Sequence, residues 1–298
     1  MTDRQALLSD RAPYSPIIDR PFLRPPEGAR MLVWIIVNVE HWSIERAMPR
    51  TVLSPPMGQP LLPDLPNWAW HEYGMRVGFW RFFEALRLRG ITPTLALNGI
   101  VCQRYRRIVE KAHAAGWEFM GHGFVQQAMH AVTDQAANIR QTIEAITEVT
   151  GSPPAGWESP GLTETAETLD HLSAAGIRYV ADWVLDDQPT WLIAHPRPVL
   201  SVPYTVEIND IPVILLQAHP AEEFFRRGVA QLDRLWIDSA ESTRIMSISV
   251  HPYILGVPHR IASFERLLDA VLAKPEVRVL TGAQIAHWYA EQIPPPER

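Results

Sequence analysis

Acidic and imidazole side chains stand shortly after several apolar runs of this chain. Glu40, His122 and His251 each occupy such a position, and they lie far apart in the sequence. Carboxylates and imidazoles serve proteins as general acids, general bases and metal ligands. If the apolar runs are neighbouring parallel strands, their carboxyl ends meet at one edge and bring these three side chains together. The sequence therefore predicts one reactive centre built from distant segments.

Helix-like segments separate the apolar runs, so the predicted order alternates between strand and helix. The predicted strands are 31–37, 92–97, 117–120, 156–160, 177–184, 211–217, 245–250 and 277–280. The predicted helices are 75–89, 103–115, 133–150, 165–175, 221–240, 261–274 and 283–291. Seven or eight strands that alternate with helices imply parallel pairing with right-handed crossovers, in an α/β barrel or a doubly wound sheet.

Proline-rich stretches mark the parts of the chain that are expected to be irregular. Prolines cluster in residues 1–30 and again in 49–66, and each proline removes a backbone hydrogen-bond donor. We expect 1–30 to be an irregular N-terminal extension, 31–292 to be a single barrel domain and 293–298 to be a tail. A length of 298 residues is typical of one barrel. The segment 49–66 is expected to pack over the barrel.

Composition excludes several functional classes. Hydrophobic residues make up 47% of the chain, as in a globular enzyme, and the net charge of -6 argues against nucleic acid as a partner. The longest apolar run near Met31 has seven residues, too few for a membrane span. A single cysteine, Cys102, and an N-terminus without an apolar signal region favour the cytoplasm. Dinucleotide-binding, Walker and serine-hydrolase motifs are absent from the sequence.

Short motifs, taken in order, resemble the polysaccharide deacetylase superfamily. They are Tyr73-Gly74-Met75-Arg76-Val77-Gly78, Gly121-His122-Gly123, Gly156-Trp157, Asp186-Asp187-Gln188-Pro189, Asn209-Asp210 and His251-Pro252-Tyr253. The resemblance runs from about Met31 to Tyr289 and is closest to the branch of cofactor-independent allantoinases and peptidoglycan-deacetylase-like proteins. It implies the NodB homology fold, a deformed (β/α)7 barrel that resembles a TIM barrel, and hydrolysis of a C–N amide bond.

The metal-binding residues of the family are changed in this chain. Its first motif holds two aspartates, a general base and a metal ligand, and the matching residues here are Asn38 and Glu40. Its second motif holds two histidines, and the matching residues here are His122 and Gln126. One carboxylate, one imidazole and one amide make a poor zinc site. We expect no cofactor or a weakly bound divalent metal such as zinc, with Glu40 and His122 as its ligands.

A third change accompanies the first. The family often carries an arginine beside the residue that matches Trp157, and this chain has Glu158 there. Asn38 cannot act as a base, because an amide takes up no proton near neutral pH. If Glu158 points inward, it can hydrogen-bond Asn38 and take over the role of base.

Hydrolysis of a C–N bond needs an activated water, a donor to the developing oxyanion and an acid for the leaving nitrogen. Glu40 and Glu158 are the two candidates for the base. His251 is the candidate acid or stabiliser of the tetrahedral intermediate, and His122 is expected to polarise the carbonyl, directly or through a metal. A structural role is the alternative for each, such as an ion pair between Glu40 and Arg76. The expected substrate contacts are Trp157, Asp187, Tyr204 and Trp70.

The sequence thus predicts a cytoplasmic hydrolase of a small amide, ureide or cyclic imide, with weak or no metal dependence. One alternative is a metal-dependent N-deacetylase of an N-acetylated sugar or glycan, in carbohydrate metabolism. Another is an inactive protein that binds a ligand without turnover. The resemblance further implies a homo-oligomer, a dimer or a tetramer, with a small molecule as substrate and no membrane partner.

Overall fold

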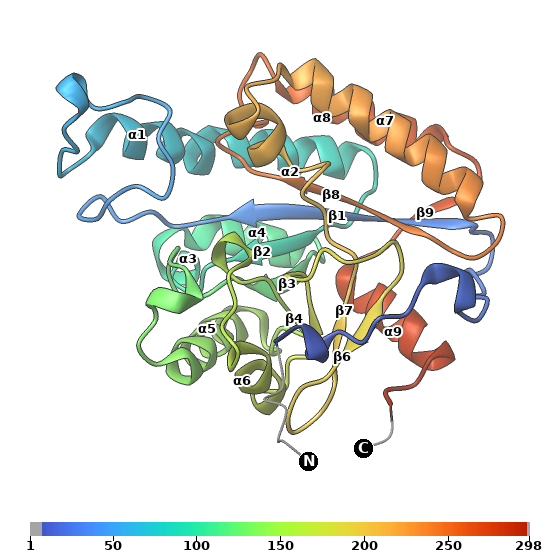
Figure 1. The fold of residues 1–298 in the computed structure, drawn as a ribbon. Helices are drawn as coiled ribbons and strands as arrows, with labels where there is room; N and C mark the ends of the chain where they lie inside the picture. Colours follow the sequence, from blue (N-terminus) through green and yellow to red (C-terminus); the bar gives the residue numbers. More distant parts are fainter. Residues whose placement is uncertain (1–7, 297–298) are drawn as a thin grey trace.

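One curled, mostly parallel sheet forms the centre of the protein (Figure 1). The computed structural model describes residues 8–296, so the outermost residues of both predicted end segments, 1–7 and 297–298, lie outside the described residues. The strands are β1 (Met31–Val39), β2 (Thr94–Leu97), β3 (Glu118–Gly121), β4 (Gly156–Trp157), β5 (Tyr179–Val180), β6 (Thr190–Leu192), β7 (Val199–Ser201), β8 (Ile245–Val250) and β9 (Val277–Val279). Their order is β6-β7-β5-β4-β3-β2-β1-β8, and β9 pairs with β1.

The expected deformed barrel is confirmed as this half-barrel sheet with helices around it. All strand pairs are parallel except β6 with β7. The helices are α1 (Leu65–Tyr73), α2 (Phe79–Leu88), α3 (Val101–Arg104), α4 (Arg106–Ala114), α5 (Gln135–Thr150), α6 (Thr168–Ala174), α7 (Ala221–Asp238), α8 (Ile261–Ala273) and α9 (Gly282–Gln292). In Figure 1, α7 and α8 cover β1 and β8, whereas α9 lies beside β6 and β7.

Strand β1 shows how the sheet positions a site. Successive side chains of a strand point to opposite faces. Val33, Ile35 and Val37 pack in the cluster that joins the sheet to the outer helices. Leu32, Trp34 and Ile36 pack inside the curl, with Ile285 and Tyr289 of α9. By the same alternation, the side chains of Asn38 and Glu40 point toward the interior at the carboxyl end of β1.

The other strands repeat this plan, with an apolar inner face that becomes polar where the strand ends. Met120 of β3 and Ile245 of β8 belong to the inner cluster, and polar residues on the same faces follow toward the carboxyl ends. The buried polar side chains at these ends are Asn38, Glu40, Asn98, His122, Glu158, Ser249 and His251. The curl of the sheet therefore gathers them into one interior layer.

A π-helical turn, η4 (Gly74–Gly78), joins α1 to α2 and packs against the loop that follows β8. A Cβ atom on Gly74 would lie 2.5 Å from the backbone nitrogen of Tyr253, and one on Gly78 would overlap the carbonyl oxygen of Pro252. Glycine at both positions allows the helix backbone to touch the loop that carries His251. The glycines of the Tyr73–Gly78 motif therefore support the loop that carries the His251-Pro252-Tyr253 motif.

The segment predicted as strand 211–217 is a helix, which corrects that prediction. Residues Ile211–Leu216 form the π-helical turn η7, with Pro212 in its first turn. A short, continuous apolar run fits a buried helix as well as a strand, and a proline cannot donate to a sheet ladder. The sequence also gave no signal for α1, or for β6 and β7.

The proline-rich segment is irregular as expected, but its middle does not pack over the barrel. Residues 51–62 project with α1 to one side of the molecule (Figure 1), and Met57 is 95% exposed. Asn67 anchors the base of this segment, because its side chain accepts from the backbone nitrogens of Val52 and Leu53 at 2.8 and 2.9 Å. Six apolar side chains here are exposed: Val52, Leu53, Met57, Leu61, Leu62 and Leu65.

The N-terminal extension carries two short 3-10 turns, η1 (Leu8–Arg11) and η2 (Ile17–Asp19). Arg11 pairs with Asp170 at 2.7 Å, and Arg20 pairs with Asp186 at 2.5 Å, so the extension is tied to the body of the domain. Within residues 8–296, no helix is long and apolar enough to cross a membrane.

We expect alanine at residue 78 to destabilise the protein by about 1–3 kcal/mol, because the added methyl group must push the loop after β8 away. Val77→Ala is the matched control, since Val77 lies in the same turn and is 37% exposed. Urea unfolding of Gly78→Ala and Val77→Ala measures the difference. Equal stability of the two variants would contradict the close packing described above.

Candidate active site

Glu40, His122 and His251 converge, as the sequence predicted. The Nε2 atom of His122 lies 3.9 Å from Glu40 Oε1, and the Nε2 atom of His251 lies 3.8 Å from the same oxygen. The three residues are only 4%, 2% and 3% exposed, respectively. One carboxylate oxygen therefore faces two imidazoles inside a closed chamber.

Glu40 is held as an anion. Trp42 donates its indole N–H to Glu40 Oε2 at 2.7 Å, and Gln126 donates its amide to Oε1 at 3.0 Å. Burial acts to raise the pKa of Glu40, but the interactions with His122 and His251 outweigh it and hold the pKa at about 2. A carboxylate with so low a pKa is a weak base, so Glu40 suits the role of a fixed negative charge better than that of proton acceptor.

Glu158 has the opposite character. It points inward, 3% exposed, and burial, together with the charge of Asp182, raises its pKa to about 7 although His122 acts to lower it. A base whose pKa matches the working pH is the more effective one. Of the two carboxylates that the sequence singled out, Glu158 is therefore the better candidate base.

A neutral network surrounds the Glu158 carboxylate. Tyr204 donates its hydroxyl to Glu158 Oε1 at 3.1 Å and lies 2.6 Å from Ser249 Oγ. When the Asn38 amide is oriented to accept from Ser249 Oγ at 2.9 Å, its nitrogen lies 3.2 Å from both Glu158 oxygens. We take this orientation because it satisfies both neighbours, and it matches the predicted bond between Asn38 and Glu158.

His251 is oriented by a residue that the sequence interpretation passed over. Its Nδ1 atom lies 2.6 Å from Asp210 Oδ1, and its backbone nitrogen donates to Asp210 Oδ2 at 2.8 Å. Asp210 is fully buried just before η7. Since a carboxylate on Nδ1 fixes the imidazole tautomer, it leaves Nε2 to face Glu40. The motif Asn209-Asp210 pointed to this region. The incorrect prediction of a strand at 211–217, however, gave no reason to place Asp210 beside His251.

His122 keeps one ring nitrogen for a ligand. Its Nδ1 atom bonds the backbone oxygen of Glu158 at 2.8 Å, and its buried Nε2 atom has no hydrogen-bond partner among residues 8–296. Burial acts to lower the pKa of His122, but Glu40 and Glu158 raise it overall. A protonated Nε2 beside Glu40 is placed to donate a hydrogen bond to a carbonyl oxygen.

The alternative ion pair between Glu40 and Arg76 is not formed, because Arg76 pairs with Glu72 at 3.2 Å. Among the predicted substrate contacts, Tyr204 joins the Glu158 network. Trp70 packs 5.0 Å from Tyr253 by ring centroids, at the edge of the chamber.

Two predicted substrate contacts lie elsewhere. Trp157 is fully buried in the cluster between the sheet and helices α5 and α6, because its strand position alternates with that of inward Glu158. The backbone oxygen of Asp187 accepts from Ile245 at 2.9 Å, at the start of β8, whereas His251 follows the end of that strand. The structure therefore does not bring Trp157 or Asp187 to the cluster.

The donor set does not fit the metal that the family implies. Both ends of the Gln126 amide are used, since its nitrogen bonds Glu40 and its oxygen accepts from Asn98 at 3.1 Å. Across the described part of the chain, no group of three or more His, Cys, Asp or Glu side chains is arranged to hold a metal ion. A zinc site needs three protein ligands of these types, so the residues present do not form one.

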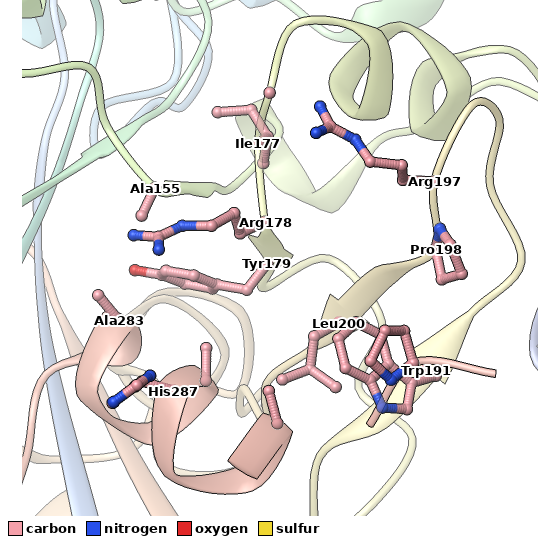
Figure 2. Close-up of a pocket in the computed structure, with 14 residues that line it drawn as sticks. Ala155, Ile177, Arg178, Tyr179, Trp191, Arg197, Pro198, Leu200, Ala283 and His287 are labelled. Atoms are coloured by element: carbon pink, nitrogen blue, oxygen red, sulfur yellow. The ribbon is translucent and has the colours of Figure 1, made fainter. Parts of the chain in front are cut away.

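A cavity of about 310 Å³ borders the cluster, lined by Trp42 and Gln126, the two side chains that donate to Glu40. A larger cavity of about 490 Å³ lies beside α9 (Figure 2). Its lining includes Arg178 and Tyr179, at the amino end of β5. Of these two cavities, the smaller lies at the carboxyl ends of the strands, where the reactive groups are.

We expect Asp182→Asn to move the acidic limb of the rate profile to lower pH by about one unit, because it removes a negative charge that disfavours ionised Glu158. Activity should rise as Glu158 loses its proton, through pH 7 in the parent and at lower pH in the variant. The measurement is kcat/KM against pH.

Glu164→Gln is the matched control for this charge. Burial and the charge of Asp182 raise the pKa of Glu164 to about 10, so that carboxyl is already neutral. Its variant should leave the limb in place. An unmoved limb in Asp182→Asn would show that Glu158 is not the titrating group.

Three relatives give the comparison with known proteins. Residues 70–180 match the family model described as polysaccharide deacetylase. A Schizosaccharomyces pombe protein whose name assigns it to the polysaccharide deacetylases is 24% identical over 243 residues, 75% of this chain and 76% of that protein. The crystal structure of a probable polysaccharide deacetylase from Pseudomonas aeruginosa PAO1 has a TM-score of 0.82 at 25% identity, with 93% and 96% of the two chains covered.

The crystal structure of PuuE allantoinase has a TM-score of 0.83 at 23% identity, and the match covers 99% of this chain and 100% of that one. At this identity the likeness concerns the fold. Together with the family model, these matches confirm the resemblance to the polysaccharide deacetylase superfamily that the motifs indicated.

Proposed function

We propose that this chain, which carries a polysaccharide deacetylase domain, hydrolyses the C–N bond of a small neutral amide, ureide or cyclic imide in the cytoplasm. The observation that carries the proposal is a pair of buried carboxylates with divergent pKa values, about 2 for Glu40 and about 7 for Glu158, on either side of the His122 ring. Glu40 lies 3.9 Å from Nε2 of that ring, and Glu158 lies 3.9 Å from Nδ1. Active sites in which one group acts as an acid and another as a base typically contain titratable groups with divergent pKa values.

In this reaction Glu158 accepts a proton from water, and the water oxygen bonds to the carbonyl carbon. His122 donates a hydrogen bond to the carbonyl oxygen as it becomes an oxyanion. The C–N bond then breaks, and His251, oriented by Asp210, donates a proton to the leaving nitrogen. Glu40 stabilises His122 in its protonated form. One water is consumed for each bond broken.

Enclosure supports a small substrate. All four reactive side chains are less than 5% exposed, and the bordering cavity is about 310 Å³. A small ligand fits a site of this size, whereas a glycan polymer needs an open groove. The middle of the proline-rich segment projects away from the barrel, so it does not contribute to this enclosure.

The donor set supports hydrolysis with weak or no metal dependence. Glu40 is engaged by Trp42 and Gln126, and His122 is the only imidazole of the family's second motif that this chain retains. A metal-dependent deacetylase of N-acetylated sugars remains the alternative function, since the superfamily carries that activity.

We expect purified protein to hydrolyse one or more members of a panel of amides, ureides and cyclic imides, and to keep its activity after dialysis against a chelator. Glu158→Gln should lower kcat by about 10²–10⁴-fold, as loss of a general base does. Glu167→Gln, an exposed carboxylate on the surface, is the matched control.

Three results would contradict the proposal. Turnover of N-acetylated glycan oligomers but not of small substrates would favour the deacetylase. Loss of activity on chelation with recovery on added zinc would favour metal chemistry. Binding without turnover across the whole panel would favour an inactive ligand-binding protein.

We also propose that the protein is a homo-oligomer in which the projecting segment 51–62 contacts a second copy. Contiguous exposed apolar side chains are typical of protein interfaces. This segment has no charged residue and exposes Met57 and Leu61.

We expect Met57→Glu combined with Leu61→Glu to lower the mass of the assembly in analytical ultracentrifugation, since buried charges disfavour the contact. Leu88→Glu is the control, because Leu88 is 67% exposed at the end of α2, outside the segment. An unchanged mass in the double variant would remove the segment from the interface.

A further inference from the structure

His71 is a buried polar side chain that the mechanism above does not use. It is fully buried in α1, and neither ring nitrogen has a hydrogen-bond partner within the described residues. Its ring stacks on Trp42, with centroids 4.3 Å apart and planes at 17°. Trp42 in turn donates to Glu40, so His71 lies one ring away from the reactive carboxylate.

Tyr253 is a second such group. Its ring lies 5.1 Å from the His71 ring and 5.7 Å from the His251 ring, and the residue is 1% exposed. Its hydroxyl also forms no hydrogen bond of normal geometry within residues 8–296, although the Arg50 side chain approaches it closely enough to act on its pKa. Two unpartnered polar groups thus adjoin each other beside the chamber.

Unpartnered groups of this kind call for a ligand. Buried side-chain donors and acceptors are nearly always satisfied, and each one left unsatisfied destabilises the fold. The Nε2 atom of His122 is a third unpartnered group, on the other side of Glu40. A native protein retains such groups where function uses them.

The chemistry of the two rings defines the ligand. Burial holds the pKa of His71 at about 3, so its imidazole is neutral and offers one donor and one acceptor. The Tyr253 hydroxyl also donates and accepts. Neutral groups that both donate and accept match an edge where N–H and C=O stand side by side.

We propose that His71 and Tyr253 form a recognition subsite for the neutral N–H and C=O edge of the substrate, as found in a cyclic imide or a ureide. This inference rests on the proposed function and names the part of the substrate that does not react. The aromatic layer of Trp42, His71 and Tyr253 supplies flat apolar contact, and the polar atoms supply orientation.

Two conservative variants test the subsite. His71→Phe keeps a stacking ring and removes both nitrogens, and Tyr253→Phe removes only the hydroxyl. Each should raise KM about tenfold with little change in kcat, because a lost uniform contact weakens binding alone. Each should also leave the melting temperature unchanged or raise it, because an unsatisfied buried group disappears.

Tyr289→Phe is the control, since Tyr289 lies on α9 at the far end of the curl and should change neither KM nor kcat. A variant that melts lower while KM stays constant would show that the groups serve the fold, and would overturn the inference.

Binding separates this inference from the proposed function. Calorimetric titration of the Glu158→Gln protein uses hydantoin and succinimide as probes, with N-acetylglucosamine for comparison. We expect binding of hydantoin or succinimide that His71→Phe and Tyr253→Phe weaken about tenfold. Such binding without turnover by the parent protein would overturn hydrolysis and keep the subsite. Binding of N-acetylglucosamine alone, or of no probe, would overturn the subsite.

Discussion

The buried negative charge of Glu40 is the constraint on which the chamber depends. An isolated carboxylate inside a protein costs several kcal/mol unless nearby charges and donors compensate for it. Here Trp42 and Gln126 donate to it directly, and His122 and His251 face its second oxygen. Any change at Glu40 therefore alters two imidazoles at once. Both rings face the same fixed anion.

The two buried carboxylates of the centre differ in pKa because their surroundings differ. Interactions with two imidazoles outweigh the burial of Glu40 and keep it ionised, whereas His122 does not offset the burial of Glu158 and the charge of Asp182. The difference in environment alone gives one carboxylate a low pKa and the other a pKa near neutrality. The same logic applies to His251, whose partner Asp210 fixes its tautomer on one side while Glu40 faces it on the other.

Much of the centre could be predicted, because the alternation of strand side chains is visible in the sequence. Glu40, His122 and His251 follow strands, so a parallel sheet must bring them together, and Glu158 points inward for the same reason. The alternation also argues against Trp157 as a substrate contact, since it precedes Glu158 and faces the helices.

The residues that the sequence did not reveal come from helical segments and their termini. Asp210 precedes a turn that was misread as a strand, and His71 lies on a helix for which no signal was seen. A helix has no fixed relation to the sheet register, so which of its side chains reaches the centre depends on packing. Gly74 and Gly78 set that packing by allowing close contact with the loop after β8.

The same electrostatics explain why the first motif carries Asn38 rather than an aspartate. The Asn38 amide nitrogen lies 3.2 Å from both oxygens of Glu158 in the orientation that satisfies Ser249. An aspartate there would place two carboxylates in contact, and one of them would hold a proton at neutral pH. The neutral amide instead donates to the ionised form of Glu158. In the proposed mechanism the two changes at Asn38 and Glu158 act together, because the Asn38 amide supports the ionised form of Glu158, which serves as the base at the end of β4.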